Sequence, residues 1–168
     1  MALWSGPVHR VGKGCVIDDP YPPFEPVSID SAKWIWTNEG NPAVAAPVGE
    51  RTFTKSFEVS DLKAVSSAKT AFTADNRFRL FVNGELVSSG TDFHQIETAD
   101  VRSVLKAGVN TLRVEAINDG DAPNPAGLIG TLEVVQNDGQ RVVVSTDSSW
   151  SASLGDRAVA EGPWNMGP

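Results

Sequence analysis

Hydrophobic and polar positions alternate in short runs along most of this chain. In "RFRLFVN", Phe78, Leu80 and Val82 alternate with Arg77 and Arg79. A two-residue period is that of a β-strand with one buried face, and the runs are rich in β-branched and aromatic residues. The pattern predicts strands at 33–36, 51–59, 68–74, 77–83, 85–89, 95–99, 111–117, 127–135, 140–146 and 150–154.

Turn-forming residues separate these runs. Asn83-Gly84 and "NDGQ" at 137–140 predict tight hairpins, because such residues tolerate positive φ. One helical turn is expected at 100–106, with Asp100 as its N-cap. Many short strands separated by turns predict an all-β antiparallel sandwich or barrel, and no internal repeat suggests a propeller. We expect one such domain over residues 31–168, after an extended Pro/Gly-rich arm at 1–30.

Strand direction predicts which loops lie together. If successive strands alternate in direction, every second connection lies at the same end of the sandwich. One end of the sandwich then holds the long polar loops, with Asp75-Asn76 in their middle. The opposite end holds mostly tight turns and the helical turn. The connections at the end with the long polar loops are 37–50, 75–76, 90–94, 118–126 and 147–149.

Composition narrows the classes of partner. The chain has 168 residues, 40% of them hydrophobic, and a formal net charge of −7 without any Lys/Arg cluster. Phosphate neutralisation drives nucleic-acid binding, so we expect no nucleic-acid partner. No apolar run approaches the roughly 20 residues of a membrane span, and no signal peptide is visible. These features favour a cytoplasmic or non-classically secreted protein, or a processed chain.

Cysteine and histidine offer little chemistry. Cys15 is the only cysteine, and His9 and His94 are far apart in the sequence. One thiol and two distant imidazoles predict neither a disulfide nor a zinc site. A nucleophilic Cys15 paired with His9 is conceivable, but nothing nearby marks this thiol as activated.

The polar loops at the predicted rich end gather amide and carboxylate oxygens. Hard divalent cations such as Ca²⁺ bind six to eight oxygen ligands in irregular geometry, and the same groups hydrogen-bond sugar hydroxyls. The alternative is that Asn and Asp occur there only as turn residues. The set comprises Asn38, Glu39, Asn41, Asp75, Asn76, Asn118, Asp119, Asp121 and Asn124.

Asp75-Asn76 carries the most information in this set. Strands disfavour both residues, and a two-residue link between strands usually contains Gly. Bound metal or sugar explains polar residues there better than turn geometry alone.

Catalytic motifs are absent. The chain contains no G-x-S-x-G, no H-E-x-x-H and no phosphate-binding Gly loop. Asp75 and Asp119 could face each other as a glycosidase pair, but a sandwich of this size leaves little protein for the required cleft. We therefore expect no enzyme activity.

Five motifs, in order, resemble the accessory β-sandwich modules of α-L-rhamnosidases, and this resemblance implies an antiparallel jelly-roll β-sandwich of the galactose-binding-like type. The resemblance covers roughly residues 32–168, and "GPWNMGP" is similar to the C-terminal segment of those modules. The motifs are "KWIWTNEGNPAVAAPVGERTFTKSFEV", "TADNRFRLFVNG", "NTLRVEAINDG", "PAGLIGTLEV" and "STDSSW".

The resemblance implies a Ca²⁺ ion and an L-rhamnose bound together at the loop end. By motif match, the implied metal ligands are Asp75, Asn76, Asn118 and the carbonyl of Pro125. The catalytic helical barrel of the rhamnosidases has no counterpart, so their hydrolase activity is not implied. The "GDAPN" loop and the arm also depart from the modules, which leaves the contacts to an outer sugar open.

Individual side chains extend the predicted sugar site. Asn38, Glu39, Asp75, Asn76, Arg77, Asn124 and Trp164 are the predicted sugar-binding residues. Arg77 can reach a sugar hydroxyl or pair with Asp119. Trp164 can cover the sugar's methyl group or clamp the C-terminal segment, while one or both of Trp34 and Trp36, and also Trp150, are expected to pack in the core.

Three hypotheses follow. The leading one is a calcium-dependent lectin for rhamnose-containing glycans or related sugars, without catalysis or membrane insertion. The second is a detached accessory domain of a glycoside hydrolase, and the third is a structural interaction domain. Oligomeric state stays open.

Overall fold

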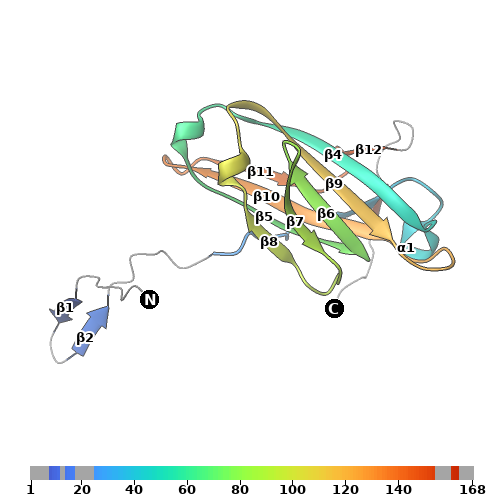
Figure 1. Ribbon diagram of the computed structural model, residues 1–168, viewed down its shortest axis with the longest axis horizontal. Coiled ribbons are helices and arrows are strands. Elements are labelled where there is room, and N and C mark those ends of the chain that lie inside the picture. The colour runs from blue at the N-terminus through green and yellow to red at the C-terminus, as the bar shows by residue number, and fades with distance from the viewer. Residues whose placement is uncertain (1–7, 12–13, 18–24, 154–159, 163–168) are drawn as a thin grey trace.

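Two antiparallel sheets pack face to face in the computed structural model, which describes residues 8–11, 14–17, 25–153 and 160–162 (Figure 1). The first sheet has the order β13 (Ala160–Gly162), β3 (Trp34–Trp36), β10 (Gly127–Gln136), β5 (Val65–Asp75) and β8 (Glu97–Asp100), and β11 (Arg141–Ser145) also pairs with β10. The second has the order β12 (Ser151–Ala152), β4 (Gly49–Val59), β9 (Gly108–Asn118), β6 (Arg77–Val82) and β7 (Glu85–Gly90). The predicted all-β sandwich is confirmed.

The elements differ from the prediction mainly at their ends. The longest strands, β4, β5 and β9, each run for 11 residues, because pairing across the sheet extends them beyond their alternating core. The helical turn expected at 100–106 is a 3-10 turn at Arg102–Val104. Its N-cap position is Val101 and not Asp100 as predicted, although the Asp100 carboxylate accepts a hydrogen bond from the Arg102 N–H. A second 3-10 turn spans Leu62–Ala64.

A short helix and an N-terminal hairpin were not predicted, and neither were the Leu62–Ala64 turn and β13. A short helix, α1 (Pro42–Ala45), begins after Asn41, whose side-chain oxygen accepts a hydrogen bond from the Ala43 N–H. In the N-terminal arm, β1 (Val8–Val11) and β2 (Gly14–Ile17) form an antiparallel hairpin that includes Cys15. Among the described residues, no helix is long and apolar enough to cross a membrane.

The core lies between the two sheets and is organised around aromatic pairs. Trp36 packs against Phe53 with 5.5 Å between ring centroids, and Phe72 meets Trp150 edge-on at 6.3 Å. Trp36 and Trp150 are buried, as predicted, and Trp34 packs partly buried against the same cluster. This apolar centre leaves polar chemistry to the ends and outer faces of the sandwich.

Strand pairing brings the predicted loops to one end. Asp75, the last residue of β5, lies opposite Gly127, the first of β10. Asn118, the last residue of β9, lies opposite Gly49, the first of β4. The predicted grouping of loops 37–50, 75–76 and 118–126 is therefore found, and we call this region the loop end.

Candidate functional site

Asp75 and Asn76 carry the chain from one sheet to the other. The Asn76 N–H donates to the Ile117 carbonyl at 2.9 Å, and the Asn76 side-chain oxygen accepts from the Asp119 N–H at 2.7 Å. The peptide bond between Asp75 and Asn76 is cis. An amide oxygen has two lone pairs, so the Asn76 side-chain oxygen keeps one acceptor position open.

The Asp75 carboxyl group lies in a poorly solvated position. Only 8% of Asp75 is exposed. Burial raises the pKa of this carboxyl above its usual value, and the charge of nearby His94 offsets part of the rise. The site thus holds a carboxylate that gains from a cation placed beside it.

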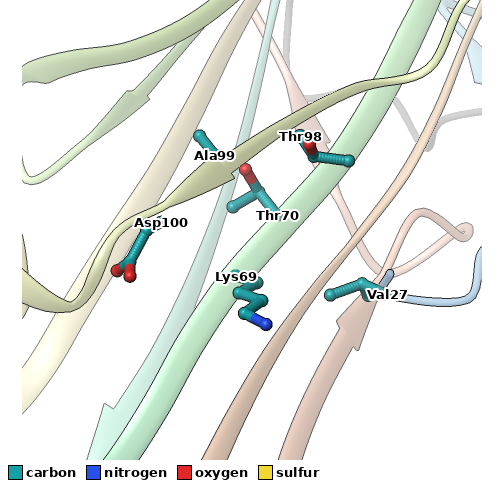
Figure 2. A pocket seen from close by; sticks show the side chains of 6 residues that line it. All are labelled: Val27, Lys69, Thr70, Thr98, Ala99 and Asp100. Atoms are coloured by element: carbon teal, nitrogen blue, oxygen red, sulfur yellow. The ribbon is translucent and has the colours of Figure 1, made fainter. Parts of the chain in front are cut away.

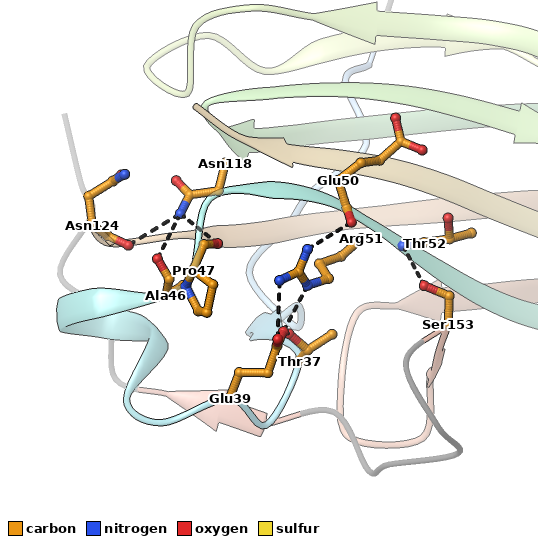
Figure 3. A network of polar contacts seen from close by, with 10 residues as sticks. All are labelled: Thr37, Glu39, Ala46, Pro47, Glu50, Arg51, Thr52, Asn118, Asn124 and Ser153. Carbon is orange, nitrogen blue, oxygen red and sulfur yellow. Dashed lines mark hydrogen bonds and ion pairs between the residues drawn. The ribbon is translucent and has the colours of Figure 1, made fainter. Parts of the chain in front are cut away.

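Asn118 presents a buried oxygen atom without a partner. Its side-chain NH₂ donates to the carbonyls of Ala46, Pro47 and Asn124 at 3.1, 3.3 and 3.4 Å (Figure 3). These three acceptors fix which side of the amide is nitrogen, so the oxygen points away from them. That oxygen is buried and accepts no hydrogen bond within the described structure.

The loop before β10 closes the site from the other side. Asn124 and Ala46 form an isolated antiparallel bridge, and the Asn124 side chain donates to the carbonyls of Asp119 and Ala122. Gly120, at φ +135°, makes room for this side chain, because a Cβ there would lie 2.9 Å from the Asn124 amide nitrogen. The loop presents Pro125 two residues before Gly127, the partner of Asp75.

The four predicted metal ligands therefore belong to adjacent segments of the loop end. They supply one carboxylate, two side-chain amide oxygens and one proline carbonyl, which is the hard oxygen chemistry that Ca²⁺ accepts. The buried, unpartnered oxygen of Asn118 fits such an ion. Within the described ranges no group of three or more His, Cys, Asp or Glu residues is placed to hold a metal.

Glu39 takes part in a second network beside this site. Its carboxylate accepts hydrogen bonds from Arg51 at 2.7 and 3.1 Å and from the Thr37 hydroxyl (Figure 3). The Arg51 side chain is only 11% exposed, so this ion pair anchors the 37–41 loop to β4. Asn38 lies exposed on that anchored loop.

Arg77 pairs with Asp119, one of its two predicted roles. The guanidinium donates through Nε and Nη2 to both carboxylate oxygens of Asp119, at 2.6 and 2.7 Å. These hydrogen bonds lower the pKa of Asp119 and raise that of Arg77. Asp119 is therefore held as a carboxylate beside Asn76.

The 91–94 loop adds groups that were not singled out from the sequence. The His94 ring stacks on Phe93 with 3.9 Å between centroids, and its Nδ1 lies 2.8 Å from the Asp92 carboxylate. Hydrogen bonds from the His94 N–H and ring lower the pKa of Asp92. The alternation of strand directions predicts this loop at the loop end, and that prediction was the sequence feature that could have identified these residues. Trp164, the predicted sugar-facing ring, lies outside the described residues.

A separate hollow of about 350 Å³ lies among β5, β8 and Val27 (Figure 2). Lys69 and Asp100 occupy opposite positions there on the paired strands β5 and β8. Thr70 also borders the hollow, but alternation along β5 places its side chain on the opposite face from Lys69. The predicted site residues lie elsewhere, at the loop end.

Comparison with known proteins gives a partial match. No protein-family model matches the chain. It is 31% identical over 152 residues to an α-L-rhamnosidase of Streptomyces avermitilis, covering 87% of this chain and 14% of that protein. This chain is related to one part of the α-L-rhamnosidases. It spans about one seventh of that relative's length.

Solved structures give the same rhamnosidase relationship and add a lectin. A crystal structure of Streptomyces avermitilis α-L-rhamnosidase complexed with L-rhamnose matches 80% of this chain and 13% of that chain, with TM-score 0.70 and 29% identity. A crystal structure of a lectin from Pleurotus ostreatus in complex with GalNAc matches 77% of this chain and 36% of the lectin chain, with TM-score 0.62 and 34% identity. The rhamnosidase-related chain is thus a carbohydrate-binding or accessory type of domain, and its small share of the enzyme is compatible with a non-catalytic role.

Proposed function

We propose that this protein is a calcium-dependent, rhamnose-binding module without catalytic activity. The observation that carries the proposal is the buried, unpartnered oxygen of Asn118 at the same end of the sandwich as the poorly solvated carboxyl of Asp75. A buried acceptor without a partner costs about 1–3 kcal/mol, so its presence favours a ligand that occupies it.

Asp75, Asn76, Asn118 and the Pro125 carbonyl would hold the ion. Bound Ca²⁺ supplies open coordination positions that two neighbouring sugar hydroxyls can fill. Only one of the four protein ligands carries a charge, so the empty site should bind Ca²⁺ weakly and sugar and metal should tighten each other equally. Exposed Asn38 on its anchored loop and the half-buried amide of Asn76 are the residues we assign to sugar contacts.

The charges at the loop end support a binding role over catalysis. A glycosidase needs a free acid and base on opposite sides of its substrate. Asp119, the other carboxylate of the predicted pair, has both oxygens bound by Arg77. Asp119 is thus committed to an ion pair.

The alternative is a detached accessory domain that acts beside a separate hydrolase. The observation in its favour is that the chain corresponds to only 14% of its rhamnosidase relative. Copurification of a hydrolase with the tagged chain would favour this alternative, and both forms predict the same sugar site.

Calorimetric titration of L-rhamnose tests the proposal. We expect binding with Ca²⁺ that disappears in EDTA and in Asp75→Asn, because the isosteric amide keeps the shape and removes the charge. Asp121→Asn, in the exposed loop that follows β9, is the matched control and should bind like wild type. Undiminished rhamnose binding by the chelated protein would show that Asp75-Asn76 is only a structural link.

A further inference from the structure

We propose that a groove beside Asn76 is a second subsite, which takes a neutral sugar residue linked to the one at the calcium site. The inference rests on the proposed function and extends it from a single sugar to a glycan. The groove has a volume of about 330 Å³, which is room for one monosaccharide unit. Its described lining residues are Arg77, Phe78, Arg79, Ser89, Gly90, Thr91 and Ile117.

The groove begins next to the proposed metal ligands. Arg77, in its wall, directly follows Asn76, and the carbonyl of Ile117 accepts the Asn76 N–H at 2.9 Å. Pairing of Arg79 with Ser89 and of Arg77 with Ile117 places these residues on β6, β7 and β9 of the second sheet. Asn76 therefore separates two adjacent binding positions, which suits two linked sugars.

The lining offers hydrogen-bonding groups that ion pairs hold in place. Arg77 uses Nε and Nη2 for Asp119 and keeps the donors of Nη1. Arg79 uses Nη2 for Glu115 at 2.6 Å and Glu50 at 3.3 Å, and keeps those of Nε and Nη1. A guanidinium has five N–H donors, so among the described residues each arginine retains donors that a sugar hydroxyl can accept.

The other walls complete the chemistry of a sugar subsite. Ser89 and Thr91 are exposed and bring hydroxyl groups, and Ile117 brings an apolar surface. Gly90 has no side chain where β7 crosses Phe78, since a Cβ there would lie 2.6 Å from the Phe78 ring. Fixed donors, hydroxyls and an apolar surface together match the mixed polar and apolar faces of a sugar ring.

Charge balance decides the class of sugar. The two arginines of the groove are paired with the carboxylates of Asp119, Glu115 and Glu50, and Glu115 is shared with Arg113, so three arginines balance three carboxylates among the described residues. No surplus positive charge remains for a uronic acid or a sulfated sugar. The occupant we infer is therefore a neutral residue.

Filling the groove tests the inference. Ser89→Trp places a large ring in it, and Ser56→Trp is the matched control on the outward face of β4 in the same sheet. The probes are methyl α-L-rhamnoside, the α-(1→2), α-(1→3) and α-(1→4) rhamnose disaccharides, and a rhamnosyl-glucuronic acid, all titrated with Ca²⁺. We expect one neutral disaccharide to bind at least about five-fold tighter than the monosaccharide in wild type and Ser56→Trp.

Ser89→Trp should lose that gain and keep the affinity for the monosaccharide, and the glucuronic acid compound should show no gain. Equal affinity for all probes in wild type, or a gain that survives Ser89→Trp, overturns the subsite while the calcium-site proposal stands. Preference for the anionic probe overturns the neutral assignment. If no sugar binds with Ca²⁺, the proposed function fails and the subsite fails with it.

Discussion

At the scale of single residues, two buried oxygen atoms without partners have different meanings. The Asn118 oxygen lies at the loop end, whereas the Thr70 hydroxyl lies within β5, where the neighbouring Ala68 and Phe72 belong to the core. An orphan acceptor beside other amide and carboxylate oxygens is the observation on which we base the proposed binding site. An orphan hydroxyl between apolar side chains is a local cost to stability.

Replacing Thr70 by valine should therefore stabilise the protein. Thr70→Val exchanges an unpartnered hydroxyl for a methyl of similar size, and we expect the free energy of unfolding to rise by about 1 kcal/mol. Thr146→Val is the control at another fully buried threonine, whose hydroxyl donates to the Lys33 carbonyl at 2.7 Å and accepts from the Gly130 N–H at 3.1 Å. That change should lower the free energy of unfolding by about 1–3 kcal/mol. Urea unfolding measures both, and a loss of stability in Thr70→Val would contradict the assignment.

Asp75 should make the metal-free protein sensitive to pH. Its pKa is raised in the folded state, so its contribution to stability is present below the unfolded pKa and is lost as pH rises through the folded pKa. In EDTA, the free energy of unfolding of Asp75→Asn should therefore rise relative to that of wild type as pH rises through the acid range. At neutral pH it should exceed the wild-type value by about 1 kcal/mol.

The pKa values of Asp92 and Asp119 are lowered and give stability that is lost as pH falls. These contributions are common to both proteins and cancel in the difference. With excess Ca²⁺, wild type should instead be more stable than Asp75→Asn, because only the wild-type folded state is stabilised by binding the ion. Thermal unfolding between pH 3.5 and 7.5 checks this, and a pH-independent difference in EDTA would rule it out.

At the scale of elements, the close pairing of β5 with β10 positions the site. This pairing continues from the centre of the core to Asp75 and Gly127 at the loop end. Gly130 lies opposite Phe72, and a Cβ there would overlap the Phe72 ring. Glycine in the middle of a buried strand is explained by this close approach.

Gly130→Ala should lower the free energy of unfolding by about 2 kcal/mol through overpacking against Phe72. A smaller side chain at position 72 relieves the overlap, so Phe72→Leu combined with Gly130→Ala should destabilise less than the sum of the two single changes. A double-mutant cycle in urea measures this coupling. Strict additivity would show that the two residues do not interact.

At the scale of the whole molecule, the chain is a sandwich related to a small part of a much larger enzyme. Of the predicted glycosidase pair at the loop end, the Asp75 carboxyl is poorly solvated and the Asp119 carboxylate is bound by Arg77. Because Arg77 binds both oxygens of Asp119, this carboxylate is not free to act as the second member of a catalytic pair, which supports the proposed binding role.

We expect no release of the aryl group from an aryl α-L-rhamnoside above the uncatalysed background, with or without Ca²⁺. A spectrophotometric assay at high protein concentration measures it. Turnover that disappears in both Asp75→Asn and Asp119→Asn would overturn the non-catalytic assignment and restore the glycosidase pair.

The sequence by itself determined the fold class and the grouping of loops. Alternating patterns located nearly all strands of the sandwich, since burial of one face imposes a two-residue period. Counting strand directions placed Asp75-Asn76 at the same end as the 118–126 loop, because the chain reverses direction at each strand and every second connection lies at the same end. The metal ligands themselves came from resemblance, and their role stays a prediction.

Only the tertiary structure decided what the individual polar groups do. The sequence predicts the same sugar-binding role for Glu39, Arg77 and Asn124. In the structure Glu39 pairs with Arg51, Arg77 pairs with Asp119, and Asn124 donates to a carbonyl of its own loop. The Asn118 amide likewise turns its oxygen away from the carbonyls of Ala46, Pro47 and Asn124, which come from two loops far apart along the chain. Hydrogen bonds are short and directional, so which groups are paired and which remain for a ligand depends on distances that no local pattern contains.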